Sequence, residues 1–156
     1  PTIDTIPKVF YINKNKANRE VAILINGTLA NQTVMETLES KMIDSVHVEK
    51  QEFEIDGKTY SGKIRIEMKA GYRPHYVSLN AIKEKYLDRE QCPVIFFIDD
   101  RLVSDNYNDF LVDENYILKI VVEPIENSEE SLRLNVVRLV TKTEENIRKS
   151  KQIMLR

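Results

Sequence analysis

The sequence predicts an α+β protein made of two tandem units, each a small mixed or antiparallel sheet with one packed helix. Two continuous apolar runs, at residues 21–25 and 94–98, are typical of strands that are buried on both faces. A turn dipeptide ends each run, Asn26-Gly27 in the first case and Asp99-Asp100 in the second. Segments that alternate apolar and polar residues then follow each run in the same order. We therefore expect the same structural unit twice.

The spacing of these segments indicates an internal duplication. When Ile25 is aligned with Ile98, the alternating segment that begins at Ile64 falls on the one that begins at Val137, with no gap. The segment at residues 46–49 falls on the one at residues 120–123 with a shift of a single position. So small a drift across three segments is better explained by duplication than by chance. Two units of about 70 residues are too few for a solenoid, which favours a pair of packed domains.

The patterns also divide the chain. The first unit covers residues 9–70, a connecting segment with a helix covers residues 71–92, the second unit covers residues 93–142, and a charged tail covers residues 143–156. The 156 residues are long enough for one ordinary domain or for two small domains that share a core.

Turn and cap residues mark the elements of the first unit. Residues 9–12 are expected to form a short strand, and Asn26-Gly27 suits a type I′ hairpin turn. Thr33 and Glu36 fit a capping box, with Thr33 as the cap of a short helix that ends near Ser40. We expect two antiparallel strands to follow. They occupy parts of residues 43–55 and 64–69, with a hairpin turn at Asp56-Gly57 between them.

The rest of the chain is expected to contain two further helices around the second sheet. Ser78 is the predicted cap of a helix that buries Leu79 and Ile82 and ends near Glu90. Thr143 is the predicted cap of a weakly anchored helix in the tail. The remaining predicted elements are a short helical piece at 107–111, a strand at 117–122, an exposed acidic loop at 123–131 and a last strand at 132–141.

Ten apolar residues on the predicted strands are expected to be largely buried. They are Ile23, Ile25, Val46, Val48, Ile64, Ile66, Phe96, Ile98, Ile120 and Val122.

Composition and charge exclude several classes of protein. The net charge of −2 and the lack of a stripe of Lys and Arg argue against a general nucleic-acid binder. No apolar run approaches the length of a membrane span. A single cysteine, Cys92, excludes an internal disulfide and a multi-cysteine metal site, and its position favours a buried structural thiol. The chain opens at Pro1, which we interpret as a mature or trimmed sequence whose compartment stays open.

The first half contains an apolar strand with a tight turn at residues 23–28, a strand at residues 42–50 and a closing strand at residues 60–69. This succession resembles the plug domain of TonB-dependent outer-membrane receptors. Residues 93–142 resemble the same pattern less closely, since their last strand lacks the glycine. The run before the closing strand is also reduced to Tyr60-Ser61-Gly62, and no TonB box is recognisable.

The resemblance implies a plug-like fold, present as two tandem copies without the barrel of the receptors. It further implies a non-enzymatic interaction or signalling module of a cell-envelope protein, in the periplasm or associated with the outer membrane. An envelope protein is the expected partner, and no cofactor is implied.

The candidate binding residues fall into three groups. Asp99 and Asp100 end a buried strand, where paired carboxylates can hold Mg²⁺, although a hairpin tip is the favoured interpretation. Tyr72 and Tyr76 lie near the junction of the two units and could line a ligand-binding surface. The third group is the set of acidic residues in the predicted loop, namely Glu123, Glu126, Glu129 and Glu130.

Two other functions compete with the interaction module. One is a metal-dependent hydrolase that uses Asp99 and Asp100. The other is a secreted carbohydrate- or peptide-binding protein that uses the tyrosines. Histidine does not favour an enzyme, because His47 lies on a charged strand face and His75 lies in a loop with no Ser or Cys partner. Because rigid scaffolds commonly carry recognition on variable loops, we expect either the hairpin at Asp56-Gly57 or the acidic loop to contact the partner, and the acidic loop is the favoured one.

Overall fold

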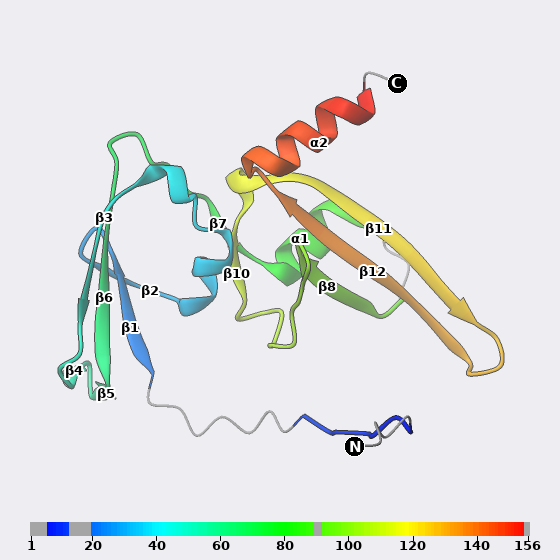
Figure 1. Cartoon of the computed structure of the whole chain (residues 1–156), viewed down its shortest axis with the longest axis horizontal. Coiled ribbons are helices and arrows are strands. Elements are labelled where there is room, and N and C mark those ends of the chain that lie inside the picture. Colours follow the sequence, from blue (N-terminus) through cyan, green and yellow to red (C-terminus); the bar gives the residue numbers. More distant parts are fainter. Residues whose placement is uncertain (1–5, 13–19, 89–91, 155–156) are drawn as a thin grey trace, which may run out of the picture.

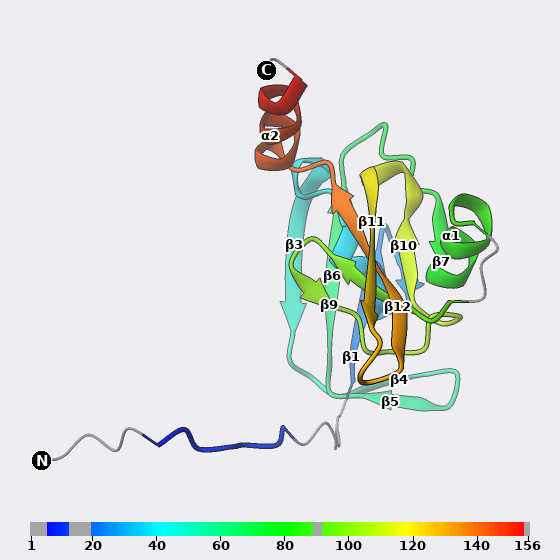
Figure 2. The same ribbon diagram turned by 90° about the vertical axis from the view of Figure 1, so that its right-hand side faces the viewer.

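The computed structural model describes residues 6–12, 20–88 and 92–154. Within these ranges the protein is a mixed α+β fold in which strands predominate and helices are few, as predicted. Two four-stranded sheets stand on either side of a central region of short helices and strands (Figures 1 and 2).

The first sheet contains four strands with one parallel pair at its centre. In spatial order they are β2 (Thr28–Ala30), β1 (Val21–Ile25), β6 (Gly62–Met68) and β3 (Ile43–Glu49). β1 runs parallel to β6, whereas β2 and β3 are antiparallel to their neighbours. A separate hairpin of β4 (Phe53–Ile55) and β5 (Lys58–Tyr60) connects β3 to β6.

The second sheet repeats this arrangement. Its strands in the corresponding order are β9 (Arg101–Leu102), β8 (Val94–Ile98), β12 (Leu132–Thr141) and β11 (Ile117–Asn127). β8 runs parallel to β12, and β9 and β11 are antiparallel to their neighbours. Strand order and strand directions are therefore the same in the two sheets.

The register of the two sheets is also the same. Ile25 pairs with Ile66 in the first sheet, and their counterparts in the gap-free alignment, Ile98 and Leu139, pair in the second. The shift of one position in the alignment of the two halves falls on the edge strands β3 and β11. β3 and β11 both carry an irregularity near their start, between Ile43 and Ser45 in the first and between Ile117 and Lys119 in the second.

Two longer helices and three short ones accompany the sheets. α1 (Leu79–Tyr86) follows β7 (Tyr76–Ser78), which pairs with β10 (Leu111–Asp113). α2 (Glu144–Met154) extends from the end of β12. The 3₁₀ helices are η1 (Gln32–Thr37), η2 (Ser40–Met42) and η3 (Glu114–Tyr116). The caps at Ser78 and Thr143 are confirmed, because their hydroxyls accept from the amides of Ala81 and Asn146.

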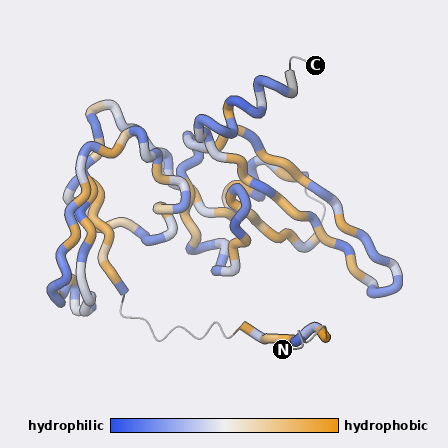
Figure 3. The backbone as a smooth tube through the Cα atoms, viewed as in Figure 1, coloured by the Kyte–Doolittle hydropathy of each residue, from blue (hydrophilic) through white to orange (hydrophobic). Residues whose placement is uncertain are grey.

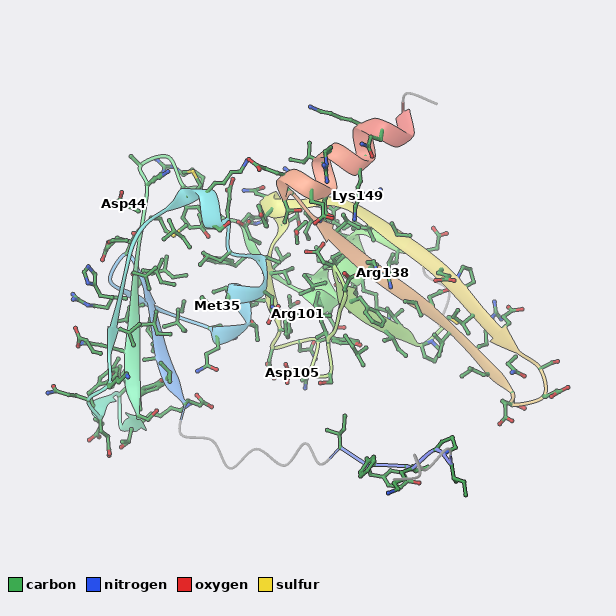
Figure 4. All side chains as sticks on the ribbon, in the orientation of Figure 1. Met35, Asp44, Arg101, Asp105, Arg138 and Lys149 are labelled. Atoms are coloured by element: carbon green, nitrogen blue, oxygen red, sulfur yellow. The ribbon has the colours of Figure 1, made fainter. Side chains whose placement is uncertain are left out.

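The two units are joined by hydrogen bonds between η1 and β10. The Thr33 hydroxyl accepts from the Leu111 amide, and the fully buried Thr37 hydroxyl accepts from the Asp113 amide, both at 2.8 Å. An ion pair of 2.7 Å between Arg101 and Glu36 adds to this contact. Figure 4 shows Arg101, on β9, at the side of the second sheet nearer η1. Backbone amides of the second unit therefore find their acceptors in side-chain hydroxyls of the first unit.

The predicted helix of the first unit is wrong in its cap and its type. Asn31, not Thr33, caps η1, since its side-chain oxygen accepts from the Thr33 amide at 3.0 Å. Thr33 is used instead in the contact with β10, and Glu36 pairs with Arg101 rather than reaching back to the cap. Tertiary contacts thus override the local capping pattern, and the first sheet receives a 3₁₀ helix where a packed α-helix was expected.

Three other predicted elements are wrong. Residues 9–12 form no strand, and residues 107–111 form a turn that leads into β10, because pairing with β7 fixes an extended backbone there. The acidic stretch at 123–131 is no loop for most of its length, since β11 continues to Asn127. Pro124 is tolerated there because an edge strand has one side without ladder hydrogen bonds.

The predicted burial of apolar residues is confirmed on the central strands and is wrong for most of those on the edge strands. Ile23, Ile25, Ile66, Phe96 and Ile98 are buried, as is Cys92. Ile64 and Ile120 are partly buried.

The edge-strand valines of the predicted core are exposed. The exposed fraction is 51% for Val46, 62% for Val48 and 43% for Val122. An edge strand has a neighbour on one side only, so an apolar residue on it is buried only when another element covers that end of the face.

The first hairpin turn is confirmed as the predicted type, because Asn26 has φ 49° and Gly27 has φ 82°. We expect Gly27→Val to lower the free energy of unfolding by about 1 kcal/mol or more, because a β-branched residue is strained at positive φ. Denaturant titration measures this change. Gly27→Asn is the matched control, since asparagine tolerates the left-handed region. Equal stability of the valine and asparagine variants would contradict the strain argument.

Candidate functional site

The structure places the predicted binding residues in three separate regions. Asp99 and Asp100 form the turn between β8 and β9, beside the end of β12 at Thr141. The four glutamates lie on β11 and the turn that follows it. Thr141 pairs with Ile117 and Leu132 pairs with Asn127, at opposite ends of the same ladder, so these two groups are separated by about 30 Å.

Asp99 is part of the fold rather than an open carboxylate. One of its side-chain oxygens accepts from the Thr141 amide at 3.0 Å and from the Asn146 side chain at 3.1 Å, and the other accepts from the Thr141 hydroxyl at 2.7 Å. Asp100 is exposed and does not share these contacts. In the described parts of the chain, no group of three or more His, Cys, Asp or Glu side chains is arranged to hold a metal ion. The pair therefore functions as a turn that anchors α2.

Tyr72 and Tyr76 lie in the junction between the two units. Their hydroxyls are hydrogen-bonded to each other at 2.9 Å, and burial raises the pKa of both above the ordinary value for tyrosine. They line a pocket of about 390 Å³ together with residues from both units, including Ile25, Val34 and Leu111. One hydroxyl donates to the other, and both side chains pack in the apolar cluster of the first unit, so we interpret Tyr72 and Tyr76 as packing residues of the junction.

The distal end of the β11–β12 hairpin projects beyond the other strands of the second sheet. β11 and β12 pair from Ile117 with Thr141 to Asn127 with Leu132, but β8 pairs with β12 only from Asn135 to Leu139. Residues 125–127 and 132–134 therefore continue as a two-stranded ribbon, which extends away from the rest of the protein in Figure 1. In this ribbon the outer edges of both strands are without a neighbouring strand.

The tip of the ribbon is polar and its turn is ordered. Figure 3 shows the distal end as hydrophilic. The Asn127 side-chain oxygen accepts from the amides of Glu129 and Glu130, which fixes the turn. Glu126 lies 3.6 Å from Arg133 across the ribbon, and both side chains are mostly exposed. The acidic residues are thus presented on a defined backbone.

The length of this ribbon was not predicted. Ile125 is the one apolar residue between Pro124 and Leu132, and it pairs with Leu134 of the predicted last strand. Proline and four acidic residues within eight positions suggested a loop instead. The strands of the first sheet show no such extension, since β3 ends at Glu49 and the β4–β5 hairpin follows.

Other charged candidates are paired on the surface. Glu49 contacts Lys63 and Arg65 across the first sheet, at 3.2 and 3.3 Å. The Lys85 ammonium, 2.8 Å from Glu114, lowers the pKa of that carboxyl. Exposed pairs of this kind contribute little to stability and form no catalytic arrangement.

Comparison with protein-family models, with curated proteins and with solved structures gives no match for this chain. Within the described residues, no helix has both the length and the apolar character needed to cross a membrane.

Proposed function

We propose that this chain is a non-enzymatic binding module of a cell-envelope protein, built from two tandem plug-like units. The shared strand order, strand directions and register of the two sheets support the duplication. The plug-like assignment rests on the resemblance of residues 23–28, 42–50 and 60–69 to the plug domain of TonB-dependent receptors. The same resemblance leads us to propose a location in the periplasm or at the outer membrane.

The β11–β12 ribbon is the proposed contact surface, and its unpaired edges carry the proposal. An exposed strand edge offers a row of backbone donors and acceptors to an extended segment of another protein. The ribbon also lies where the two units differ, because the first unit has the compact β4–β5 hairpin at the corresponding end of its sheet. A partner that adds a strand there would meet the glutamates near the tip.

Shortening the ribbon should abolish binding and leave the fold intact. In the test variant, residues 126–133 are replaced by Asn-Gly, which joins the paired residues Ile125 and Leu134 through a two-residue turn. We expect the wild-type chain to retain one envelope protein from a detergent-solubilised envelope fraction, and the shortened chain to lose it. Affinity capture followed by mass spectrometry makes the comparison, and circular dichroism checks the fold.

A charge variant separates the role of the backbone from that of the acids. Glu126→Gln, Glu129→Gln and Glu130→Gln together keep the length of the ribbon and remove three charges. Capture that survives in this variant assigns recognition to the strand edge, and capture that is lost assigns it to the acids. Equal capture by the wild-type and shortened chains would disprove the ribbon as the contact surface.

A further inference from the structure

Each sheet has one apolar face, called here its inner face, on which apolar residues of adjacent strands form rows. The rows correspond in the two sheets, but the elements that pack against them differ. Across the first sheet, one row contains Ile23, Ile64 and Val48, and the next contains Ile25, Ile66 and Val46. The rows at the same register of the second sheet contain Phe96, Val137 and Val122, and then Ile98, Leu139 and Ile120.

In the second sheet, α1 covers these rows on β8 and β12, whereas Val122 on β11 is 43% exposed. Leu79 and Ile82 of α1 are fully buried and belong to the same core cluster as Phe96, Val137 and Leu139. In the first sheet no α-helix is present among the described residues before β1. In the first sheet Ile64 is only partly buried, whereas its counterpart in the second sheet, Val137, is fully buried. Val46 and Val48 of the first sheet are more than half exposed. The β3 side of the first face therefore lacks the cover that the second face has.

The chain carries an apolar segment at the matching position. The stretch from Ile6 to Val21 is as long as the stretch from Leu79 to Val94, so residues 6–12 correspond in sequence to most of α1. Val9, at the position of Ile82, is followed by Phe10, Tyr11 and Ile12, and all four are at least three-quarters exposed. Figures 1 and 2 show residues 6–12 away from both sheets. Four consecutive exposed apolar residues are a surface that water disfavours.

We propose that residues 9–12 dock on the inner face of the first sheet, over Val46, Val48 and Ile64, and occupy the place that α1 occupies on the second sheet. The face is within reach, because eight residues separate Ile12 from Val21 and span up to about 27 Å. Two strand spacings, about 10 Å, separate β1 from β3. The first residue of β1 also lies at the same end of the sheet as Val48. Val21 pairs with Gly62, the next residue Lys63 pairs with Glu49, and Glu49 is adjacent to Val48.

The occupant is a segment of the same chain rather than a second copy, because a short linker gives an effective concentration of about 1 mM. A second copy would have to compete at the far lower concentration of the protein in solution.

Photo-crosslinking tests the docked state in the intact chain. Phe10 is replaced by p-benzoylphenylalanine, which preserves the aromatic side chain, and equal amounts of ¹⁵N-labelled and unlabelled protein are mixed before irradiation. We expect adducts within one chain, between residue 10 and peptides from residues 43–49 or 62–68, identified by mass spectrometry. Adducts only between labelled and unlabelled chains, adducts on residues 94–141, or no adduct would each overturn the proposal.

Matched variants on the two sheets make the test specific. Val48→Asp places a charge in the proposed contact and should reduce the intrachain adduct by about tenfold or more, since burial of an unpaired carboxylate costs at least the equivalent free energy. Val122→Asp, at the same register of the second sheet, should leave the adduct yield unchanged. Equal yields in the two variants would contradict docking on the first sheet. Neither result depends on the ribbon, so this proposal and the proposed function can fail separately.

Discussion

Phe96→Ala is expected to lower the free energy of unfolding by about 3–5 kcal/mol, the usual cost of removing a buried phenylalanine. Phe96 is fully buried at the centre of the second sheet, where it packs with Leu79, Val137 and Leu139. Its ring also meets the Tyr107 ring edge to face at 5.0 Å between centroids. Equilibrium denaturation by urea measures the loss.

Phe97→Ala is the matched control, because it removes the same side chain from the next position of the same strand. Phe97 lies on the opposite face, half-buried, and the Arg138 guanidinium lies 5.1 Å from its ring centroid. That contact is worth about 1 kcal/mol. Similar losses in the two variants would show that the inner face of the second sheet is not the main core of this unit.

Asp99→Ala is expected to cost about 2–3 kcal/mol, because it leaves the Thr141 amide and hydroxyl and the Asn146 side chain without their acceptor. Alanine is also less suited than aspartate to the φ of 51° at this position. Since Asn146 belongs to α2, we further expect faster amide hydrogen exchange in this helix. Denaturant titration and hydrogen exchange measured by mass spectrometry test the two effects.

The corresponding position of the first sheet suggests the controls. Asn26 occupies the place of Asp99, and its side-chain oxygen accepts from the Met68 amide at 2.8 Å. Asp99→Asn should therefore keep the turn and the bond to the Thr141 amide, and cost less than Asp99→Ala. Asp100→Ala, on the exposed neighbour, should be close to neutral. A large loss for Asp100→Ala with no loss for Asp99→Ala would reverse the assigned roles.

The candidate site could be predicted from sequence only in part. The acidic residues were expected on the surface at one end of the second sheet, and they are on the surface there. Their backbone was not predicted, because proline and acidic residues favour loops and the pairing of Ile125 with Leu134 is a contact that no local pattern specifies. The same limitation applies to Asp99, whose partners Thr141 and Asn146 lie far from it in the sequence.

The elements whose signals are local could be predicted from the sequence alone. Apolar runs placed β1 and β8, Asn26-Gly27 predicted its turn, Ser78 marked the start of α1, and the constant offset between the two halves matches the register in both sheets. These signals depend on neighbouring residues and on strand or helix periodicity, which persist whatever the tertiary contacts are.

Contacts between distant segments determine which apolar faces are covered and which polar groups join the units. Thr33 fits a helix cap in sequence but accepts a hydrogen bond from Leu111, and Val46 and Val48 fit a core strand but lie on an edge without a covering helix. The physical reason is that burial and hydrogen bonding are properties of pairs of segments. A pattern within one segment indicates which face is apolar, but the element that covers that face lies elsewhere in the chain.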